Sequence, residues 1–330
     1  MTRFKRRSLL RISAVAITLA TPAVASELQL DWPVDCALGE SCHIQQYVDH
    51  DPGPAATDFT CGALSYDGHK GTDIALPSRA AMLAGVSVRA AADGVVAGVR
   101  DGMPDTGPSD ISQVKGRECG NGVVLRHSNG WETQYCHMKR GSITVQKGET
   151  VTSGAPLGQV GLSGLTEFPH LHLSVRHKGA VVDPFTPKTP VTTCGGDSEA
   201  TLWRDAPAYV EAGLISLGFA TDVPQYDAIK AGTANQAPLA SDSPALVLWV
   251  YGFGSAPGDV LSLRITGPAG ETIYSGQQTL ERQQSQYFRA AGKRLHAPLA
   301  PGRYTGVSEL RRAGQRLDRR EIVMTLPEGS

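Results

Sequence analysis

Between residues 61 and 186, short apolar runs alternate with breaks that contain glycine, as in VSVRAAADGVVAGVR and SITVQKGETVTSGAPLGQVG. Apolar runs of this length, bounded by turn residues, predict strands. We find no amphipathic helix pattern between them. Asn129-Gly130, which separates VVLRH from WETQYCHM, predicts a hairpin with a tight two-residue turn. This part of the chain is therefore expected to be a β domain, which we place at residues 61–190.

The rest of the chain divides into three segments. Residues 26–60 show no sustained period and are expected to form an irregular leader. Residues 191–243 are expected to be a linker with one short helix near APAYVEAGLISL. From residue 244 to 330, about six apolar runs separated by turn residues predict an Ig-like β-sandwich. The predicted fold class is all-β, with an antiparallel sheet domain followed by a smaller C-terminal sandwich.

The first 25 residues have the parts of a secretory signal peptide. MTRFKRRSLLR carries five basic and no acidic side chains, an apolar run follows, and Ala23-Val24-Ala25 offers a small-residue cleavage site. The run is too short for a permanent anchor, and no later stretch reaches the roughly 20 apolar residues that a membrane span needs. We expect an exported protein, periplasmic or associated with the cell wall, without a stable membrane anchor. Arg6-Arg7 leaves both Sec and Tat export open.

The net charge of the chain adds little to these predictions. Without the signal peptide, 26 Lys and Arg face 32 Asp and Glu, a formal net charge of -6. A chain this acidic is not expected to bind nucleic acid. Acidic residues dominate up to residue 254 and basic residues dominate from residue 255 onward, which agrees with a division into two parts.

Six cysteines in an exported chain predict disulfides, because the compartment is oxidising. Six cysteines allow 15 pairings, which the sequence does not distinguish. We expect local pairs between Cys36 and Cys42 and between Cys119 and Cys136, which leaves Cys61 with Cys194. A metal role for the thiols is the alternative, but the CxxC spacing of zinc knuckles is absent.

Two pairs of residues suggest a metal site. His170 and His172 in FPHLHLSVRH would share one face of a strand, so that their imidazoles can converge on one point. His69 and Asp73 in GHKGTDIAL supply a nitrogen and an oxygen ligand close together. His69, Asp73 and His172 make the three-ligand set of a catalytic zinc site, in which water takes the fourth position.

Two histidines then remain for catalysis. His137 ends the hairpin strand, on the same face as Tyr135 and opposite Cys136 if that strand is regular. His137 and His170 suit proton transfer between water and a leaving amine, and stabilisation of the negative charge that develops on oxygen.

The ordered set of H-x3-D, an isolated histidine after a tyrosine, and H-x-H resembles the lysostaphin-type, or LytM-domain, zinc endopeptidases that cut peptidoglycan cross-links. The likeness covers roughly residues 61–186 and includes HSNGWETQYCHM and the later DPF. It implies an antiparallel sheet with one Zn²⁺ per chain in a groove, and peptidoglycan peptides as substrate. It also implies a role for five residues: His69, Asp73 and His172 as ligands, and His137 and His170 as catalytic residues.

The chain departs from this family at Glu167-Phe168-Pro169, where Gly-Pro-His is usual. We expect the departure to reshape the loop that lines the groove, and so to affect substrate preference more than chemistry. Which peptide bond is cleaved is not determined by the sequence.

Other interpretations remain. A non-catalytic module that binds peptidoglycan and regulates another wall hydrolase would be expected to have lost ligands. ADGVVAGV and VQKGETVTSGAPLGQVG resemble biotinyl and lipoyl carriers, but the lysine of such carriers is missing from the hairpin tip. A purely structural zinc would need a fourth protein ligand, such as His137. The sandwich has no titratable cluster, so we expect it to be a spacer or a binding module, and a protein partner for it is left open.

Overall fold

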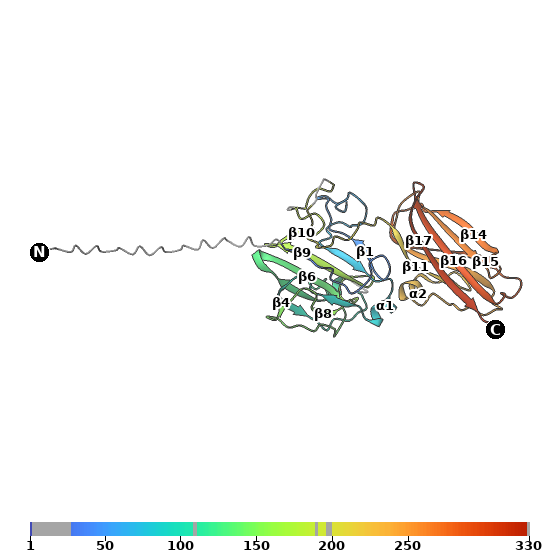
Figure 1. Cartoon of the computed structure of the whole chain (residues 1–330), viewed down its shortest axis with the longest axis horizontal. Helices are drawn as coiled ribbons and strands as arrows, with labels where there is room; N and C mark the ends of the chain where they lie inside the picture. Colours follow the sequence, from blue (N-terminus) through green and yellow to red (C-terminus); the bar gives the residue numbers. More distant parts are fainter. Residues whose placement is uncertain (2–27, 108–110, 189–190, 196–199, 329–330) are drawn as a thin grey trace.

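The computed structural model describes residues 1, 28–107, 111–188, 191–195 and 200–328, so the predicted signal peptide, apart from Met1, lies outside the described residues. The protein is nearly all β, as the sequence predicts, and its sheets are antiparallel. Figure 1 shows an N-terminal β unit beside a C-terminal one, with α1 (Arg79–Ala84) and α2 (Tyr226–Ala231) near their junction. Within the described ranges, no helix has the length and apolar character needed to cross a bilayer.

The N-terminal unit is built on one large sheet. Its strands run in the order β1-β2-β9-β6-β5-β4-β7, and β10 pairs with β9. A separate two-stranded sheet pairs β3 with β8. The bounds are β1 (His43–Gln46), β2 (Thr72–Ala75), β3 (Ser87–Arg89), β4 (Gly94–Arg100), β5 (Asn121–Arg126), β6 (Trp131–Met138), β7 (Thr150–Val151), β8 (Pro156–Gln159), β9 (His170–His177) and β10 (Ala180–Val182).

Two local features differ from the sequence prediction. The hairpin between β5 and β6 forms at Asn129-Gly130, where both residues have positive φ, but its turn is not the expected two-residue turn. The His127 N–H donates to the carbonyl of Trp131, so the loop between them has three residues. The leader, expected to be irregular, supplies strand β1, which pairs with β2 and is buried along its whole length although Ile44 is its one apolar residue.

The C-terminal unit is a β-sandwich, as predicted. A three-stranded sheet in the order β11-β12-β15 and a four-stranded sheet in the order β14-β13-β16-β17 enclose an apolar core. The six predicted strands correspond to six of these seven. The bounds are β11 (Gly213–Ala220), β12 (Ala245–Ser255), β13 (Val260–Thr266), β14 (Thr272–Thr279), β15 (Gln284–Arg294), β16 (Gly302–Arg312) and β17 (Gln315–Leu326).

The seventh strand is β11, and it lies where the sequence predicted a helix, near APAYVEAGLISL. That prediction is wrong. The second half of that segment begins β11, whose Leu214 and Phe219 are buried in the sandwich core. Its backbone pairs with β12 over the full length of the strand. The helix of the linker lies further along, at α2.

All three predicted disulfides form: Cys36 with Cys42, Cys61 with Cys194, and Cys119 with Cys136. The second of these joins segments 133 residues apart and ties the start of the linker to the N-terminal unit. Cross-links between distant segments restrict the unfolded chain most.

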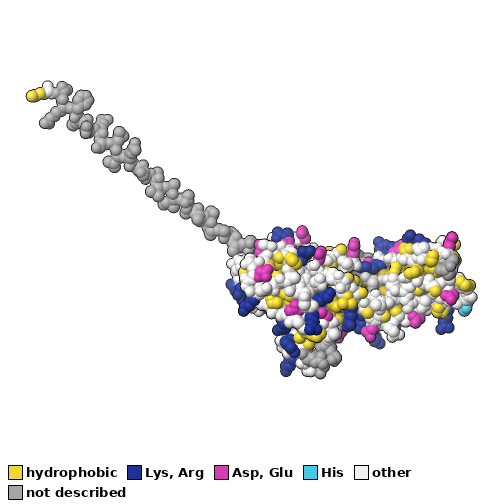
Figure 2. Space-filling model, turned by 90° about the horizontal axis from the view of Figure 1, so that it is seen from below, with side chains coloured by type: hydrophobic (Ala, Val, Ile, Leu, Met, Phe, Trp, Pro, Cys, Tyr) yellow, Lys and Arg dark blue, Asp and Glu magenta, His cyan; other side chains and the backbone are white. Residues whose placement is uncertain are grey.

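The two units are in direct contact. His43 on β1 stacks on Phe253 of the sandwich, with ring centroids 4.5 Å apart. Gln45 donates from Nε2 to the carbonyl of Ser285 at 2.7 Å, and Gln286 donates back to Gln45 Oε1 at 3.1 Å. The space-filling view of Figure 2 shows the two units touching, with acidic and basic side chains interspersed over this face.

Candidate active site

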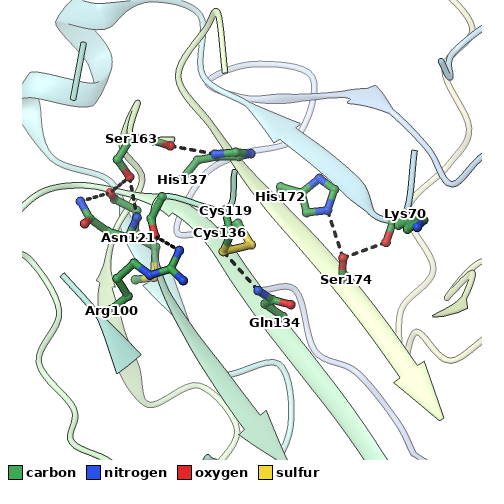
Figure 3. Close-up of a disulfide and its surroundings, with 12 residues drawn as sticks. Lys70, Arg100, Cys119, Asn121, Gln134, Cys136, His137, Ser163, His172 and Ser174 are labelled. Carbon is green, nitrogen blue, oxygen red and sulfur yellow. Dashed lines mark hydrogen bonds between the residues drawn. A yellow bond between two sulfur atoms is a disulfide. The ribbon is translucent and has the colours of Figure 1, made fainter. Parts of the chain in front are cut away.

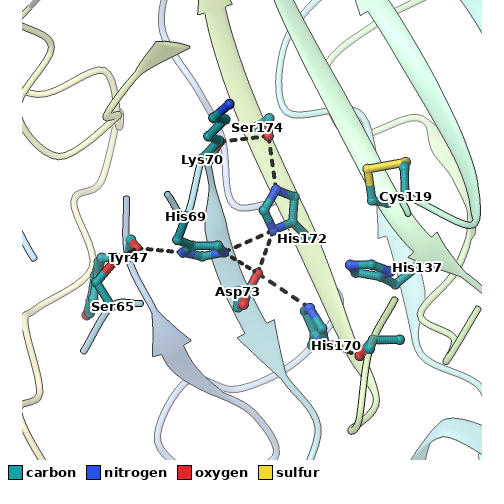
Figure 4. A network of polar contacts seen from close by, with 12 residues as sticks. Tyr47, Ser65, His69, Lys70, Asp73, Cys119, His137, His170, His172 and Ser174 are labelled. Carbon is teal, nitrogen blue, oxygen red and sulfur yellow. Dashed lines mark hydrogen bonds and ion pairs between the residues drawn. A yellow bond between two sulfur atoms is a disulfide. The ribbon is translucent and has the colours of Figure 1, made fainter. Parts of the chain in front are cut away.

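The structure brings together the five residues singled out in the sequence, His69, Asp73, His137, His170 and His172 (Figure 4). Asp73 lies on β2 and His172 lies opposite it on β9, so that their side chains share one face of the sheet. His170 precedes His172 on the same strand, and His137 is near the end of β6. His69 lies just before β2. Three adjacent strands therefore position four of the five side chains.

Asp73 is at the centre of this cluster. Its Oδ1 lies 2.8 Å from His172 Nδ1, 3.2 Å from His69 Nε2 and 3.4 Å from His170 Nε2. His69 Nε2 and His172 Nδ1 are 3.1 Å apart. His137 lies on the other side of the cluster, with its ring centroid 4.7 Å from that of His170.

The orientation expected for His137 is wrong. Cys136 lies opposite His172, so a regular strand would turn the next side chain away from the cluster. His137 instead has a φ of 61°, in the left-handed region, which breaks the alternation and brings its ring to the same face as Cys136 and His172. Tyr135 remains on the opposite face, where its hydroxyl accepts a hydrogen bond from the Ala91 N–H.

Hydrogen bonds to groups outside the cluster determine which ring nitrogen of His69 and of His172 carries the proton. His69 Nδ1 lies 2.6 Å from the Tyr47 carbonyl, which can only accept, so this nitrogen carries the proton. The Ser174 hydroxyl donates to the Lys70 carbonyl at 2.8 Å and therefore accepts from His172 Nε2 at 3.0 Å. In both histidines the unprotonated nitrogen faces Asp73.

The same argument applies to the other two histidines. His137 Nδ1 donates to the Ser163 carbonyl at 2.8 Å, and His170 Nδ1 donates to the Phe168 carbonyl at 2.9 Å. Thr166 Oγ1 also donates to that carbonyl, which supports this orientation of the loop. Each ring thus keeps its Nε2 lone pair for the centre of the cluster.

Four inward lone pairs and one carboxylate can hold a cation between them. The ligating atoms of His69, Asp73 and His172 lie within 4.8 Å of one another, and so do those of His137, His170 and His172. Imidazole nitrogen and carboxylate oxygen are the ligand types of catalytic zinc sites, and orienting hydrogen bonds such as those above usually surround them. The donor set therefore fits zinc. The distances are compatible with either of two triads of ligands, which share His172.

The charges in the cluster shift its pKa values in opposite directions. Burial acts to raise the pKa of Asp73, but His69 and His170 hold it well below its usual range. Burial acts to lower the pKa of His69, yet the neighbouring carboxylate outweighs it and the pKa is raised. Burial and the charges of His170 and His172 lower the pKa of His137 well below its ordinary value. His137 is therefore neutral near neutral pH, and burial lowers the pKa of His172 as well.

The Cys119–Cys136 disulfide lies directly beside His137 (Figure 3). The His137 N–H donates to the Cys119 carbonyl at 2.8 Å. Ser163, whose carbonyl accepts from the His137 ring, is itself held by its hydroxyl, which donates to the Met138 carbonyl at 2.7 Å and accepts from the Asn121 N–H at 2.9 Å. The backbone on both sides of His137 is thus fixed by covalent and hydrogen-bond contacts.

Other histidines near the N-terminal sheet have structural positions. His50 Nε2 contacts Asp183 Oδ2 at 2.7 Å, and His127 contacts the Asp93 carbonyl. The exposed Tyr66 lies at the edge of the cluster, with its ring centroid 4.5 Å from that of His69. Sequence reasoning missed Ser174, although a strand period of two places it on the face of His172.

Comparison with known proteins agrees with this geometry. Residues 67–184 match the model described as peptidase family M23. This segment is an M23 peptidase domain. The M23 domain lies within the predicted range of residues 61–190 and contains all five residues of the cluster.

Several curated proteins are similar to this M23 domain. The DD-carboxypeptidase/endopeptidase Mpg of Neisseria gonorrhoeae is 36% identical over 124 residues, which are 37% of this chain and 23% of that protein. The peptidoglycan DD-endopeptidase ShyA of Vibrio cholerae is 30% identical over 125 residues, 38% of this chain and 24% of that protein. The chain therefore spans about a quarter of the length of these relatives.

Among solved structures, the catalytic domain of the antimicrobial peptidase lysostaphin from Staphylococcus simulans is 22% identical, with a TM-score of 0.26. The match covers 40% of this chain and 84% of that domain.

Proposed function

We propose that this protein is an exported zinc-dependent endopeptidase that hydrolyses peptide cross-links of bacterial peptidoglycan. The M23 domain and the names of the similar DD-endopeptidases support a peptidase that acts on the cell wall. The observation that carries the proposal is the convergence of four imidazoles and one carboxylate, with a hydrogen bond holding the second nitrogen of each ring.

His69, Asp73 and His172 would hold the metal. Bound zinc lowers the pKa of water to about 7 and polarises a carbonyl, which is the chemistry that amide hydrolysis needs near neutral pH. We choose this triad over the one of His137, His170 and His172 because it contains the carboxylate. A carboxylate ligand balances part of the charge of the cation in a buried site.

His137 and His170 then supply the groups that move protons and stabilise charge. His137 is neutral and keeps its Nε2 lone pair toward the cluster, so it can accept a proton from water and deliver it to the leaving amine. His170 Nε2 faces the centre of the cluster, 3.4 Å from Asp73 Oδ1. We assign to His170 the second catalytic role, which is to stabilise the oxygen on which negative charge develops.

Digestion of isolated peptidoglycan by the mature protein tests this proposal, with the released fragments identified by mass. We expect cleaved cross-links and about one zinc per chain. Activity should be lost with a chelator and recovered when zinc is added. A protein that binds the wall without cutting it would instead support the non-catalytic regulator.

Substitutions separate the two roles. His69→Ala and Asp73→Ala should lose both zinc and cleavage, whereas His137→Ala and His170→Ala should keep zinc and lose cleavage. Zinc content is measured by elemental analysis on the same samples as the cleavage assay. Full activity of His170→Ala would contradict the assigned roles.

A further inference from the structure

A groove of about 380 Å³ lies between the M23 domain and the sandwich. One wall belongs to the start of α1 and the segment that precedes β9, and the other to α2, β12 and β15. Figure 1 shows α1 and α2 close together at this junction. The lining residues used below are Arg79, Glu167, Phe168, Asp227, Lys230 and Gln286.

Phe168 lies between the groove and the catalytic cluster. This side chain lines the groove, and its ring also stacks on His170 with centroids 4.5 Å apart. Phe168 belongs to Glu167-Phe168-Pro169, the stretch at which the sequence departs from its family. The Pro169 carbonyl accepts a hydrogen bond from the Leu76 N–H at 2.9 Å, which joins this stretch to the segment leading into α1. The groove and the cluster are therefore neighbours, separated by the Phe168 ring.

Two charges in the groove are left for a ligand. Lys230 and Asp227 pair with each other, with Nζ and Oδ1 3.1 Å apart. Arg79 and Glu167 are exposed, and across the described chain neither side chain makes an ion pair or a hydrogen bond. The groove thus presents one unpaired guanidinium and one unpaired carboxylate.

The two walls are held together by close contacts. Gly232, at the end of α2, has a φ of 83°, and a Cβ at this position would lie 2.6 Å from Ser78 Oγ. Tyr251 donates to Gln286 Oε1 at 2.7 Å, and Gln286 in turn donates to Gln45 on β1. The groove is therefore already formed before a ligand binds, which reduces the entropic cost of binding.

We propose that this interdomain groove binds a zwitterionic part of the peptide substrate, with Arg79 binding a carboxylate and Glu167 binding an amino group. The proposal rests on the proposed function, because stem peptides with a free carboxylate and a free amino group supply both charges. The sandwich domain is then part of the substrate site, since α2 forms one of its walls.

Steady-state cleavage of a cross-linked muropeptide dimer tests the groove. Arg79→Gln should raise KM roughly three- to tenfold and leave kcat unchanged, because the guanidinium contacts the substrate away from the scissile bond. Amidation of the substrate carboxylates should raise the KM of the wild type to a similar degree. Combined, the two changes should have little further effect, because both remove the same contact.

Glu167→Gln should likewise raise KM for the unmodified dimer. Acetylation of the dimer's amino groups should raise the KM of the wild type to a similar degree, and should have little further effect on Glu167→Gln. Lys293→Gln, which removes an exposed charge on β15 outside the groove, is the matched control and should leave KM unchanged. Unchanged KM in both groove variants, or additive effects of variant and substrate modification, would overturn the proposal.

Calorimetry separates this proposal from the proposed function. The probe is the same unmodified dimer, titrated into the wild type and Arg79→Gln with the His170→Ala substitution in both, so that no cleavage occurs. Weaker binding by the Arg79→Gln protein supports the groove even if the wild type cleaves no form of the dimer. Equal binding by the two proteins would contradict the proposal that the substrate binds in the groove, whether or not the enzyme is active.

Discussion

Each histidine of the cluster uses one ring nitrogen to contact a group outside it, and this contact decides which nitrogen faces the centre. The sequence predicts part of this arrangement, because a strand period of two brings His170, His172 and Ser174 to one face. It cannot predict the carbonyls of Tyr47 and Ser163, which lie 22 and 26 residues along the chain from the histidines that they contact. Their positions follow from the folded sheet.

Ser174→Ala tests the importance of these outer contacts. It removes the acceptor for His172 Nε2, so the ring is free to turn or to change its protonated nitrogen. We expect the zinc affinity to fall about 10- to 100-fold without loss of the fold. Competition with a chelating dye measures the dissociation constant.

Ser142→Ala is the matched control for this experiment. Its hydroxyl also donates to a carbonyl, that of Lys139, but it makes no contact with the histidine cluster. It should bind zinc like the wild type. An unchanged dissociation constant in Ser174→Ala would show that His172 needs no support from the serine.

At the scale of elements, the pattern of apolar runs predicts most strands but not their local irregularities. GLISLGFA is too short for periodicity to distinguish a strand from a helix, and only its pairing with β12 decides. The strand before His137 is predicted correctly, yet the positive φ of that residue has no signal in a single sequence. Its orientation depends on the neighbouring disulfide and loop.

Replacing Cys119 and Cys136 together by alanine should therefore affect catalysis as well as stability. The cross-link closes a loop of sequence separation 17, so its loss should lower the free energy of unfolding by about 3 kcal/mol. Because the Cys119 carbonyl also holds the His137 N–H, we expect kcat to fall by roughly one to two orders of magnitude. Thermal unfolding and cleavage assays on one sample separate these effects.

Replacing Cys36 and Cys42 by alanine is the control, because this disulfide has a sequence separation of only 6 and does not contact the cluster. It should lower stability less and leave kcat unchanged. Equal losses of kcat in both double variants would mean that the disulfide beside His137 has no special role.

For the whole molecule, the sequence predicts two β units but not how they meet. The contact depends on His43 and Gln45 in the leader, which no period marks as part of a strand. Burial of His43 between the units lowers its pKa to about 4. This residue therefore links the stability of the contact to pH.

The direction of this pH dependence follows from the protonation of His43 in the folded and in the unfolded chain. Above pH 6.5 the imidazole is neutral in both the folded and the unfolded chain; between 6.5 and about 4 only the unfolded chain takes up the proton. His43 should thus lower the free energy of unfolding by about 2 kcal/mol between pH 7 and pH 5. Denaturant unfolding at both pH values measures this loss.

His43→Phe keeps an aromatic ring against Phe253 but cannot bind a proton. The free energy of unfolding of this variant should therefore differ less between pH 7 and pH 5 than that of the wild type, by the loss given above. His177→Phe, at a ring stacked on Trp131 away from the interface, should retain the full difference. If the two variants show the same pH dependence, His43 is not the group responsible.

The anomalous diffraction of crystals grown with zinc, measured at the zinc absorption edge, tests the central claim most directly. The account predicts one peak, about 2.0–2.2 Å from ligand atoms of His69, Asp73 and His172, with His137 and His170 unligated. A peak bound by His137, His170 and His172, or no peak in the cluster, would contradict it.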